Sequence, residues 1–198
     1  MGLNLTYNDG QTPLDEDEKE GLIIKSISTR GELDEFEQQN IEDAIQWSLT
    51  RKFTKNQILS ESFIQELHKR MYRNVWKWAG EYRKTNKNIG VDKLEIPIVL
   101  RSLIDDAKYW LEHNVYEPDE FALRFKHKLV SIHCFPNGNG RHSRMMADII
   151  FEKIYQLPVF SWGGASLSKD TDIRAQYLKA IRKADKGDFE LLLKFARS

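Results

Sequence analysis

A stretch of twelve residues, from His133 to Arg144, combines the residue types that phosphate chemistry requires. It reads His-Cys-Phe-Pro-Asn-Gly-Asn-Gly-Arg-His-Ser-Arg. His133 is the type of side chain best suited to accept a proton near neutral pH. The glycines let the backbone approach an anion, and the amides after them can open a helix whose N-terminus attracts negative charge. Arg141 and Arg144 then share one helical face, where both can hold phosphates. The pattern predicts a general base beside a phosphate-binding site.

Each of these residues taken alone has an ordinary explanation. A Pro-Asn-Gly run is a common turn, and isolated histidines and arginines mostly lie at the surface or pack against neighbours. It is their order within one short stretch that indicates chemistry.

Apolar residues on both sides of this stretch recur at helical spacing. They are Phe121, Phe125, Leu129 and Ile132 before it, and Met145, Met146, Ile149, Ile150 and Ile154 after it. The stretch is therefore predicted to be the loop of a helix–loop–helix. A dinucleotide-binding fingerprint would need a preceding strand and a third glycine, and a P-loop would need a Gly-Lys pair, which the chain lacks. Both phosphate-binding motifs are excluded.

The rest of the chain is also predicted to be mainly helical. Ser60 is expected to cap a helix that carries Phe63, Ile64, Leu67, Met71 and Val75 on one face. Further helices are expected at 97–113, 117–131, 169–184 and 187–197. A helix from Glu32 to about Ser48 should bury a stripe made of Leu33, Phe36, Ile41, Ile45 and Trp47. Residues 84–97, rich in turn formers and β-branched residues, predict a short hairpin.

The order His-x-Phe-x-x-Gly-Asn-Gly-Arg-x-x-Arg resembles the signature of the Fic (Fic/Doc) family, whose members transfer part of a nucleotide to a protein hydroxyl. Trp78-Ala-Gly-x-x-Arg83 and Lys186-Gly-Asp-Phe189 resemble other parts of the family pattern, so the likeness covers about residues 60–197. It implies an all-α, Fic-type helical bundle with a short β-hairpin flap. The Fic domain would span 31–198, after a candidate regulatory arm at 1–30. Within that arm and just after it, Thr12-Pro-Leu-Asp15, Glu20-Gly-Leu22 and Thr29-Arg-Gly-Glu-Leu33 resemble a bacterial subgroup called mobile mystery protein B.

The resemblance implies a role for each residue of the motif. His133 would be the catalytic base. Phosphates would be bound by Gly138, Asn139, Gly140, Arg141 and Arg144, with Asn139 adding a side-chain amide donor. Tyr177 would stack on the adenine, although an ordinary helix-packing role explains a tyrosine there equally well.

Asn137 is the position where the chain departs from the family pattern. Many members carry Asp or Glu there, and that carboxylate binds Mg²⁺. A neutral amide oxygen is a weaker ligand for a hard cation. The sequence therefore leaves Asn137 as a weak candidate Mg²⁺ ligand and leaves the level of activity open.

The resemblance also implies two accessory elements. The hairpin residues Ile89, Gly90, Val91 and Leu94 would form a flap that pairs with the backbone of a target protein, although a hairpin packed on its own core fits the same residues. Glu20 and Glu32 lie in imperfect copies of the family's inhibitory Ser/Thr-x-x-x-Glu-Gly/Asn motif, and either could pair with Arg144. Because neither copy is perfect, inhibition by a separate protein, or none, is the favoured interpretation.

Composition narrows the setting. The 30 basic and 30 acidic side chains balance, so nothing favours nucleic acid or an anionic membrane as a partner, and no apolar run approaches the length of a membrane span. The single cysteine, Cys134, cannot form an internal disulfide, which fits the cytoplasm.

Four functions follow from these observations. The leading one is transfer of AMP from ATP, with Mg²⁺, to a Ser, Thr or Tyr hydroxyl of a target protein. A second is another nucleotide-dependent transfer of a phosphate group, although Gly140 stands where the phosphotransferase branch has Lys. A third is a catalytically weak nucleotide-binding module with an antitoxin or regulatory protein as partner. A fourth is a metal site built from His127, His133, Cys134 and His142, whose spacing matches no standard zinc pattern.

Overall fold

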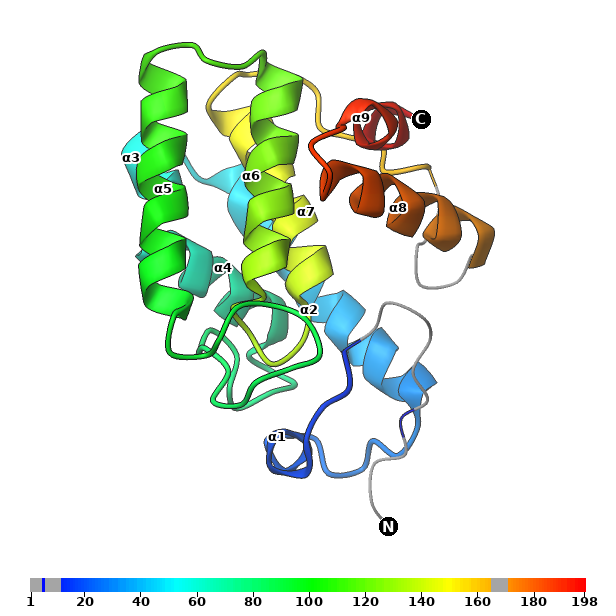
Figure 1. The fold of residues 1–198 in the computed structure, drawn as a ribbon. Helices are drawn as coiled ribbons and strands as arrows, with labels where there is room; N and C mark the ends of the chain where they lie inside the picture. The colour runs from blue at the N-terminus through cyan, green and yellow to red at the C-terminus, as the bar shows by residue number, and fades with distance from the viewer. Residues whose placement is uncertain (1–4, 6–11, 165–170) are drawn as a thin grey trace.

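The computed structural model describes residue 5, residues 12–164 and residues 171–198. The regular secondary structure of these residues is helical, with no strand among them and one isolated bridge between Leu22 and Trp76 (Figure 1). The described helices are α1 (Glu16–Glu20), α2 (Arg30–Thr50), α3 (Lys55–Ile58), α4 (Glu61–Tyr72), α5 (Ile96–Glu112), α6 (Pro118–Ile132), α7 (Asn139–Lys153), α8 (Thr171–Ala184) and α9 (Glu190–Arg197). The predicted all-α class is confirmed.

The central helices follow the signals in the sequence. Ser60 caps α4, and its hydroxyl accepts a hydrogen bond from the Phe63 N–H at 3.2 Å. Pro118 occupies the first turn of α6, where a missing N–H costs nothing. The α3 turn was not predicted; it is a single capped turn whose Thr54 and Gln57 bond each other's backbone.

Helices α6 and α7 form the middle of the bundle (Figure 1). Helix α5 packs along the outer side of α6, α4 packs against α2 and α7, and α8 pairs with α9 beside α6. The loop that joins α6 to α7 is thus held between the two best-packed helices. None of the described helices combines the length and apolar character needed to cross a membrane.

Helix α2 exists where it was predicted, and its predicted apolar stripe is confirmed in part, because Leu33 is buried and Ile41 and Trp47 pack against the core. Phe36 and Ile45 are 43% and 40% exposed, whereas Glu37, Asn40 and Ser48 are buried. The reason is that polar groups of neighbouring elements need partners. Asn40, for example, accepts from the Asn74 N–H at 3.1 Å through its side-chain oxygen.

The predicted hairpin at 84–97 is also wrong, because the segment between Arg83 and α5 forms turns without strands. Its backbone bonds to side chains instead of to a second strand. The Asn86 side chain accepts from the Lys93 N–H at 2.8 Å and donates to Asp92 at 2.7 Å, and Asp92 accepts from the Leu94 N–H at 2.9 Å. These local bonds compete with strand pairing. We keep the name flap for residues 84–95.

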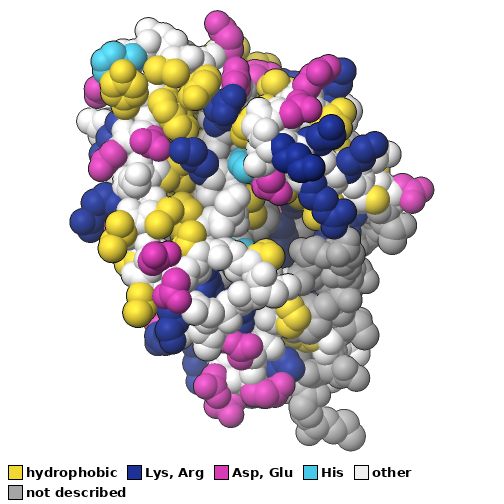
Figure 2. Space-filling model, viewed as in Figure 1, with side chains coloured by type: hydrophobic (Ala, Val, Ile, Leu, Met, Phe, Trp, Pro, Cys, Tyr) yellow, Lys and Arg dark blue, Asp and Glu magenta, His cyan; other side chains and the backbone are white. Residues whose placement is uncertain are grey.

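Apolar side chains are exposed along the face formed by the flap and α5 (Figure 2). Leu94 and Ile98 are 78% and 70% exposed, and Ile89 is 47% exposed. Val91 instead packs against the core. Of the four predicted flap residues, Ile89 and Leu94 are therefore the two whose side chains face solvent.

Candidate active site

The loop between α6 and α7 depends on two left-handed residues. His133 ends α6 with φ of 57°, and Gly138 begins α7 with φ of 77°. A Cβ at Gly138 would lie 2.5 Å from the Tyr72 ring, so both conformation and space require glycine there. The N–H groups in the first turn of α7 have no carbonyl acceptor within the helix, because no helical turn precedes them.

The side chain of Asn139 holds this loop together. Its amide oxygen accepts from the Phe135 N–H at 3.0 Å, and its amide nitrogen donates to the Phe135 carbonyl at 2.8 Å. The Asn139 side chain therefore positions the loop, with one of its two amide N–H groups used in the bond to Phe135. Its backbone N–H remains in the first turn of α7.

His68 is a positioning residue that sequence reasoning missed. Its ring is fully buried and stacks on Phe135 with centroids 3.7 Å apart. Nδ1 accepts from the Gly80 N–H at 3.0 Å, so the proton lies on Nε2, which is 3.1 Å from the Asn137 carbonyl and donates to it. Burial holds the pKa of His68 well below 6.5, which keeps this tautomer neutral. Nothing in the motif indicates a histidine on α4.

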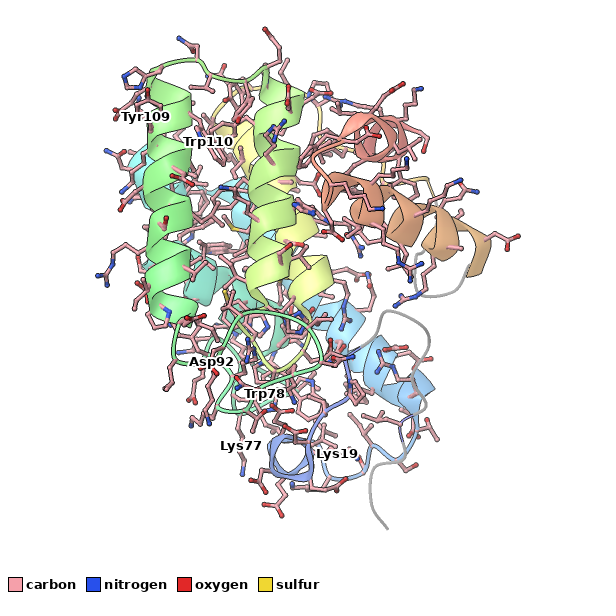
Figure 3. All side chains as sticks on the ribbon, viewed as in Figure 1. Lys19, Lys77, Trp78, Asp92, Tyr109 and Trp110 are labelled. Carbon is pink, nitrogen blue, oxygen red and sulfur yellow. The ribbon has the colours of Figure 1, made fainter. Side chains whose placement is uncertain are left out.

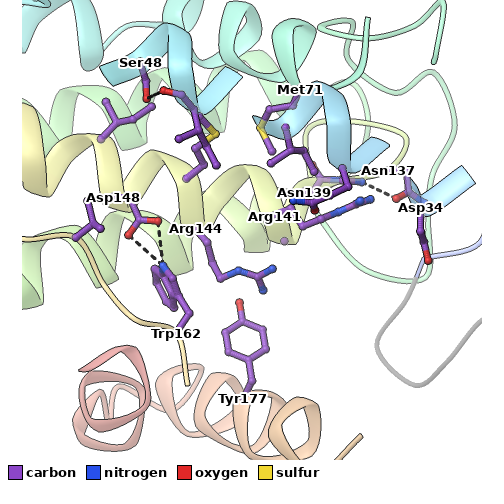
Figure 4. Close-up of a pocket in the computed structure, with 18 of the residues that line it drawn as sticks. Asp34, Ser48, Met71, Asn137, Asn139, Arg141, Arg144, Asp148, Trp162 and Tyr177 are labelled. Carbon is purple, nitrogen blue, oxygen red and sulfur yellow. Dashed lines mark hydrogen bonds between the residues drawn. The ribbon is translucent and has the colours of Figure 1, made fainter. Parts of the chain in front are cut away.

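A cavity of about 610 Å³ opens between α2, α7 and α8 in front of this loop (Figure 4). Its polar end contains the predicted residues His133, Asn137, Gly138, Asn139, Gly140, Arg141 and Arg144. Its apolar wall comes from Ile41, Ile45 and Leu49 of α2, which explains why Ile45 and Leu49 are exposed outside the core. The structure thus brings the predicted base and the predicted phosphate-binding residues into one cavity.

Asp148 lies deeper in the same cavity, one turn beyond Arg144. Its two oxygens each accept from the Trp162 indole N–H at 3.0 Å (Figure 4). Burial raises the pKa of Asp148 to about 7.

Arg141 is held by a buried carboxylate from α2. Its guanidinium lies 2.7 Å from Glu37, whose other oxygen accepts from the Trp76 indole N–H at 2.7 Å. Although burial alone would lower the pKa of Arg141, the Glu37 charge raises it above its usual value. Arg141 is therefore charged and oriented, but it carries its own counter-ion.

Arg144 has a different environment. It points toward the Tyr177 ring, with its guanidinium carbon 5.5 Å from the ring centroid (Figure 4). The buried Lys126 of α6 donates to the Tyr177 hydroxyl. Burial would raise the pKa of Tyr177, but the charges of Lys126 and Arg144 outweigh it and hold the pKa below 10. Tyr177 thus lines the cavity as predicted, within a network that fixes its hydroxyl.

His133 meets the requirements of a general base. Its side chain is buried, and neither ring nitrogen has a hydrogen-bond partner among the described residues. Burial, with the nearby charges of Arg83 and Lys87, lowers the pKa of His133 to about 4. At neutral pH the imidazole is uncharged, and its two buried nitrogens have no competing partner among the described residues, although His133 lines the cavity.

Arg83 connects the flap to the catalytic loop. Its Nε donates to the His133 carbonyl at 2.7 Å, and its other nitrogens donate to the Thr85 carbonyl at 2.8 Å and to the Val91 carbonyl. The Val91 N–H donates to the Ile132 carbonyl at 3.3 Å. Gly90 lies so close that a Cβ there would be 2.7 Å from the His133 Cβ. Flap and base are therefore packed as one unit.

A family model described as Fic/DOC matches residues 58–151, which run from α3 through the loop into α7. The chain carries a Fic/DOC family domain. Protein adenylyltransferase Fic of Drosophila grimshawi is 30% identical over 136 residues, which cover 67% of this chain and 26% of that protein. The protein of the same name from Nematostella vectensis is 25% identical over 167 residues, covering 82% of this chain and 37% of that protein. The chain thus spans about a quarter to a third of the length of these curated relatives.

Solved structures share the fold of the Fic/DOC domain. Fic-1 from C. elegans superimposes with a TM-score of 0.63 at 23% identity, over 80% of this chain and 46% of that one. BepC from Bartonella tribocorum, crystallised with bound AMPPNP, gives a TM-score of 0.66 at 16% identity over 92% of this chain and 97% of that one. The narrower likeness to mobile mystery protein B stays a prediction.

Asn137 does not fit the role of a metal ligand in this Fic/DOC domain. Its side-chain oxygen accepts from the Gly138 N–H at 2.6 Å, and its amide nitrogen donates to the Thr12 carbonyl at 3.2 Å. Both groups of the amide are thus engaged within the protein. Among the described residues, no three His, Cys, Asp or Glu side chains gather as metal ligands would, which also removes the four-residue metal site considered above.

The two predicted inhibitory glutamates lie elsewhere. Glu32 caps α2, where its carboxylate accepts from the Ser28 and Thr29 N–H groups at 2.9 and 3.0 Å. Glu20 is exposed at the end of α1, and neither residue lines the cavity. The glutamate that does reach a motif arginine is Glu37, which pairs with Arg141. The role of Glu37 was not predicted, because the sequence pattern led us to expect apolar side chains at the buried positions of α2.

Proposed function

We propose that this Fic/DOC domain is a protein adenylyltransferase that transfers AMP from ATP to a Ser, Thr or Tyr hydroxyl of a protein. The observation that carries the proposal is His133, a buried and neutral imidazole without a hydrogen-bond partner among the described residues, which lines a cavity that also contains two arginines and the N-terminus of α7. Relatives named protein adenylyltransferase Fic, and BepC with its bound AMPPNP, support the same activity.

In this mechanism His133 takes the proton of the acceptor hydroxyl as its oxygen attacks the α-phosphorus. Because the imidazole binds a proton weakly, it stays available as a base throughout the neutral range and releases the proton readily afterwards. The carbonyl bond from Arg83 and the packing of Gly90 fix where the base lies. That positioning reduces the entropy lost on reaching the transition state.

The negative charge of the phosphates would be met by the first turn of α7 and by Arg144. The backbone N–H groups of residues 139–141 belong to the first turn of α7, which lines the cavity, and the helix dipole would add to their attraction for an anion. Arg144 offers a forked donor, and Arg141 would have to share its charge between Glu37 and a phosphate. We place the adenine against Tyr177, on the α8 side of the cavity.

The exposed side chains of the flap provide the contact for a target protein. Ile89 and Leu94 are free to meet an apolar surface, whereas the N–H and carbonyl groups of Val91 are bonded to Ile132 and Arg83. Main-chain pairing with a target would therefore involve other flap residues than Val91.

Mass spectrometry tests the proposal directly. The purified protein is incubated with ATP, a divalent cation and candidate acceptor proteins, and the His133→Ala protein is run in parallel. An adenylyl adduct that depends on His133 supports adenylyl transfer. A phosphate adduct would support phosphotransfer instead, and the absence of any adduct despite ATP binding would reject transfer.

Asn137 favours a second candidate, a nucleotide-binding module with weak catalysis and a regulatory or antitoxin partner. A family carboxylate is missing at this position, and the amide present is engaged by Gly138 and Thr12. ATP binding with the affinity unchanged by His133→Ala, and with no adduct formed by either protein, would select this function.

A further inference from the structure

The N-terminal segment before α1 lies between the catalytic loop and the flap. The Thr12 carbonyl accepts from the Asn137 side chain at 3.2 Å, on the loop side. The next carbonyl, of Pro13, accepts from Lys87 of the flap at 3.4 Å. Residues 12–15 form no regular secondary structure, and Thr12 lines the cavity.

Two acidic residues that follow this stretch anchor it to the flap. The ammonium group of Lys87 lies 2.8 Å from Asp15 and 2.5 Å from Glu18, and the Thr85 hydroxyl donates to Asp15 at 2.6 Å. The side chains of Lys87 and Glu18 are 4% and 10% exposed, so this pair is shielded from solvent, whereas the Asp15 side chain is 48% exposed. A third contact adds to those of Lys87 and Thr85: the indole N–H of Trp78, which is labelled in Figure 3, donates to the Glu18 carbonyl at 2.9 Å.

Three hydroxyl side chains line the cavity: Thr12, Ser48 and Tyr177. The Ser48 hydroxyl donates to the Ile45 carbonyl at 2.8 Å, within α2. The Tyr177 hydroxyl is held by Lys126. The Thr12 hydroxyl makes no hydrogen bond with another described residue, although Thr12 is 7% exposed and is tied through its carbonyl to Asn137, four residues from His133.

We propose that Thr12 is an intramolecular acceptor of the adenylyl group, so that the domain modifies its own arm. The inference rests on the proposed adenylyltransferase function. The Thr12 oxygen forms a bond to the α-phosphorus of ATP as its proton passes to His133. The bond between the α-phosphorus and the bridging oxygen of the β-phosphate breaks, pyrophosphate leaves, and the proton is released from His133 to solvent.

The contacts that anchor the arm should make transfer to Thr12 faster than transfer to a separate protein. Because Thr12 and His133 line the same cavity of one chain, transfer to Thr12 would be an intramolecular step, with an effective concentration far above that of a free protein target. Modification should therefore proceed at a rate per molecule that does not depend on protein concentration.

The test is peptide mapping of the full chain after incubation with ATP and Mg²⁺. Cleavage after Lys19, the first basic residue, releases residues 1–19, whose hydroxyl residues are Thr6, Tyr7 and Thr12. Fragmentation should place the adduct on Thr12. Thr12→Val should abolish the adduct on this peptide, Thr12→Ser should keep it, and His133→Ala should abolish it.

Two further experiments separate this inference from its alternatives. Thr12→Val protein, which keeps its base, is mixed with His133→Ala protein, which keeps Thr12; an intramolecular reaction leaves Thr12 of the second protein unmodified. Lys87→Gln releases the anchor and should slow Thr12 labelling by up to about 10²-fold through misplacement. Lys84→Gln is the matched control, because Lys84 lies in the same flap with its side chain 84% exposed.

Each result has a defined reading. An adduct only on added proteins or on other residues of the chain overturns the Thr12 assignment and leaves the proposed function standing. Labelling of the His133→Ala protein in the mixture overturns the intramolecular route. The absence of an adduct on this chain and on every added protein rejects both proposals.

Discussion

The catalytic loop and the flap lie against each other, yet they are held in different ways. The loop between α6 and α7 is fixed by its own residues and by the core beneath it: Asn139 bonds Phe135, Phe135 stacks on His68, and His68 bonds the Asn137 carbonyl. The flap has little core of its own. It is fixed by Arg83, by the side chains of Asn86 and Asp92, and by the ion pairs of Lys87 with the arm.

This contrast suggests that the loop determines the position of the catalytic groups, whereas the flap determines how a target reaches them. A loop stabilised from below keeps the base and the anion-binding turn in place whether or not the arm is present. A flap stabilised by polar bonds to distant segments can change with those segments, because partly exposed polar contacts are weaker than a packed core. Substitutions in the two regions should therefore have separable effects on activity and on stability.

The largest effect is expected for His133→Ala. Loss of a general base typically slows a reaction about 10²–10⁴-fold, while ATP binding and the melting temperature should change little because the His133 ring has no hydrogen-bond partner among the described residues. Transfer rates and ATP titrations measure both. The exposed His113→Ala is the control, and adenylyl transfer near the wild-type rate in the His133 variant would remove the base assignment.

Arg83→Gln should break the connection between loop and flap. It removes charge-assisted bonds to the carbonyls of His133, Thr85 and Val91, each worth about 1.5–3 kcal/mol. We expect a loss of several kcal/mol in the free energy of unfolding, measured by denaturant titration, together with faster amide exchange in residues 84–95. The exposed Arg73→Gln serves as the control. Unchanged exchange in the flap would show that Arg83 does not hold it.

Lowering the pH should reduce the free energy of unfolding by protonating buried histidines of the catalytic loop and α7. The pKa of His133 and that of His142 are each lowered to about 4, chiefly by burial, while in the unfolded chain both lie near 6.5. The unfolded state therefore binds more protons between these values, so stability falls as pH drops from about 6.5 toward 4, by a few kcal/mol in all. Denaturant titrations across this range measure the loss. His142→Asn should flatten the curve, and a wild-type curve without slope would contradict the burial of these rings.

A smaller effect is expected for Glu37→Gln, which removes the counter-ion of Arg141. The charge-assisted bond is worth about 1.5–3 kcal/mol, so stability should fall by roughly that amount, while the released guanidinium should bind ATP several-fold more tightly. Isothermal titration with ATP measures the affinity, and Glu35→Gln, exposed on the same helix, is the control. Weaker ATP binding in the Glu37 variant would show that Glu37 orients Arg141 and does not compete for it.

The parts of the site that the sequence predicted are those specified by residues close together in the chain. The turn at Gly138, the helices on either side of it and the grouping of His133 with Arg144 all follow from local spacing. The parts it did not predict depend on partners far away. Glu37 is buried because Arg141 and Trp76 meet it, and the flap forms turns because Asn86 and Asp92 satisfy its backbone. Asn137 was identified only by its departure from the family's metal-binding carboxylate, because its bond to Thr12 joins residues 125 positions apart in the chain.

The position of α2 has a consequence for how this protein can be divided. The family match begins at residue 58, after α2 has ended, yet α2 supplies the counter-ion of Arg141 and one apolar wall of the cavity. A fragment starting at residue 58 would expose that wall and leave a motif arginine without its carboxylate. The smallest fragment that folds with an intact site is thus larger than the segment that the family model matches. Any transfer of this domain into another protein must include α2.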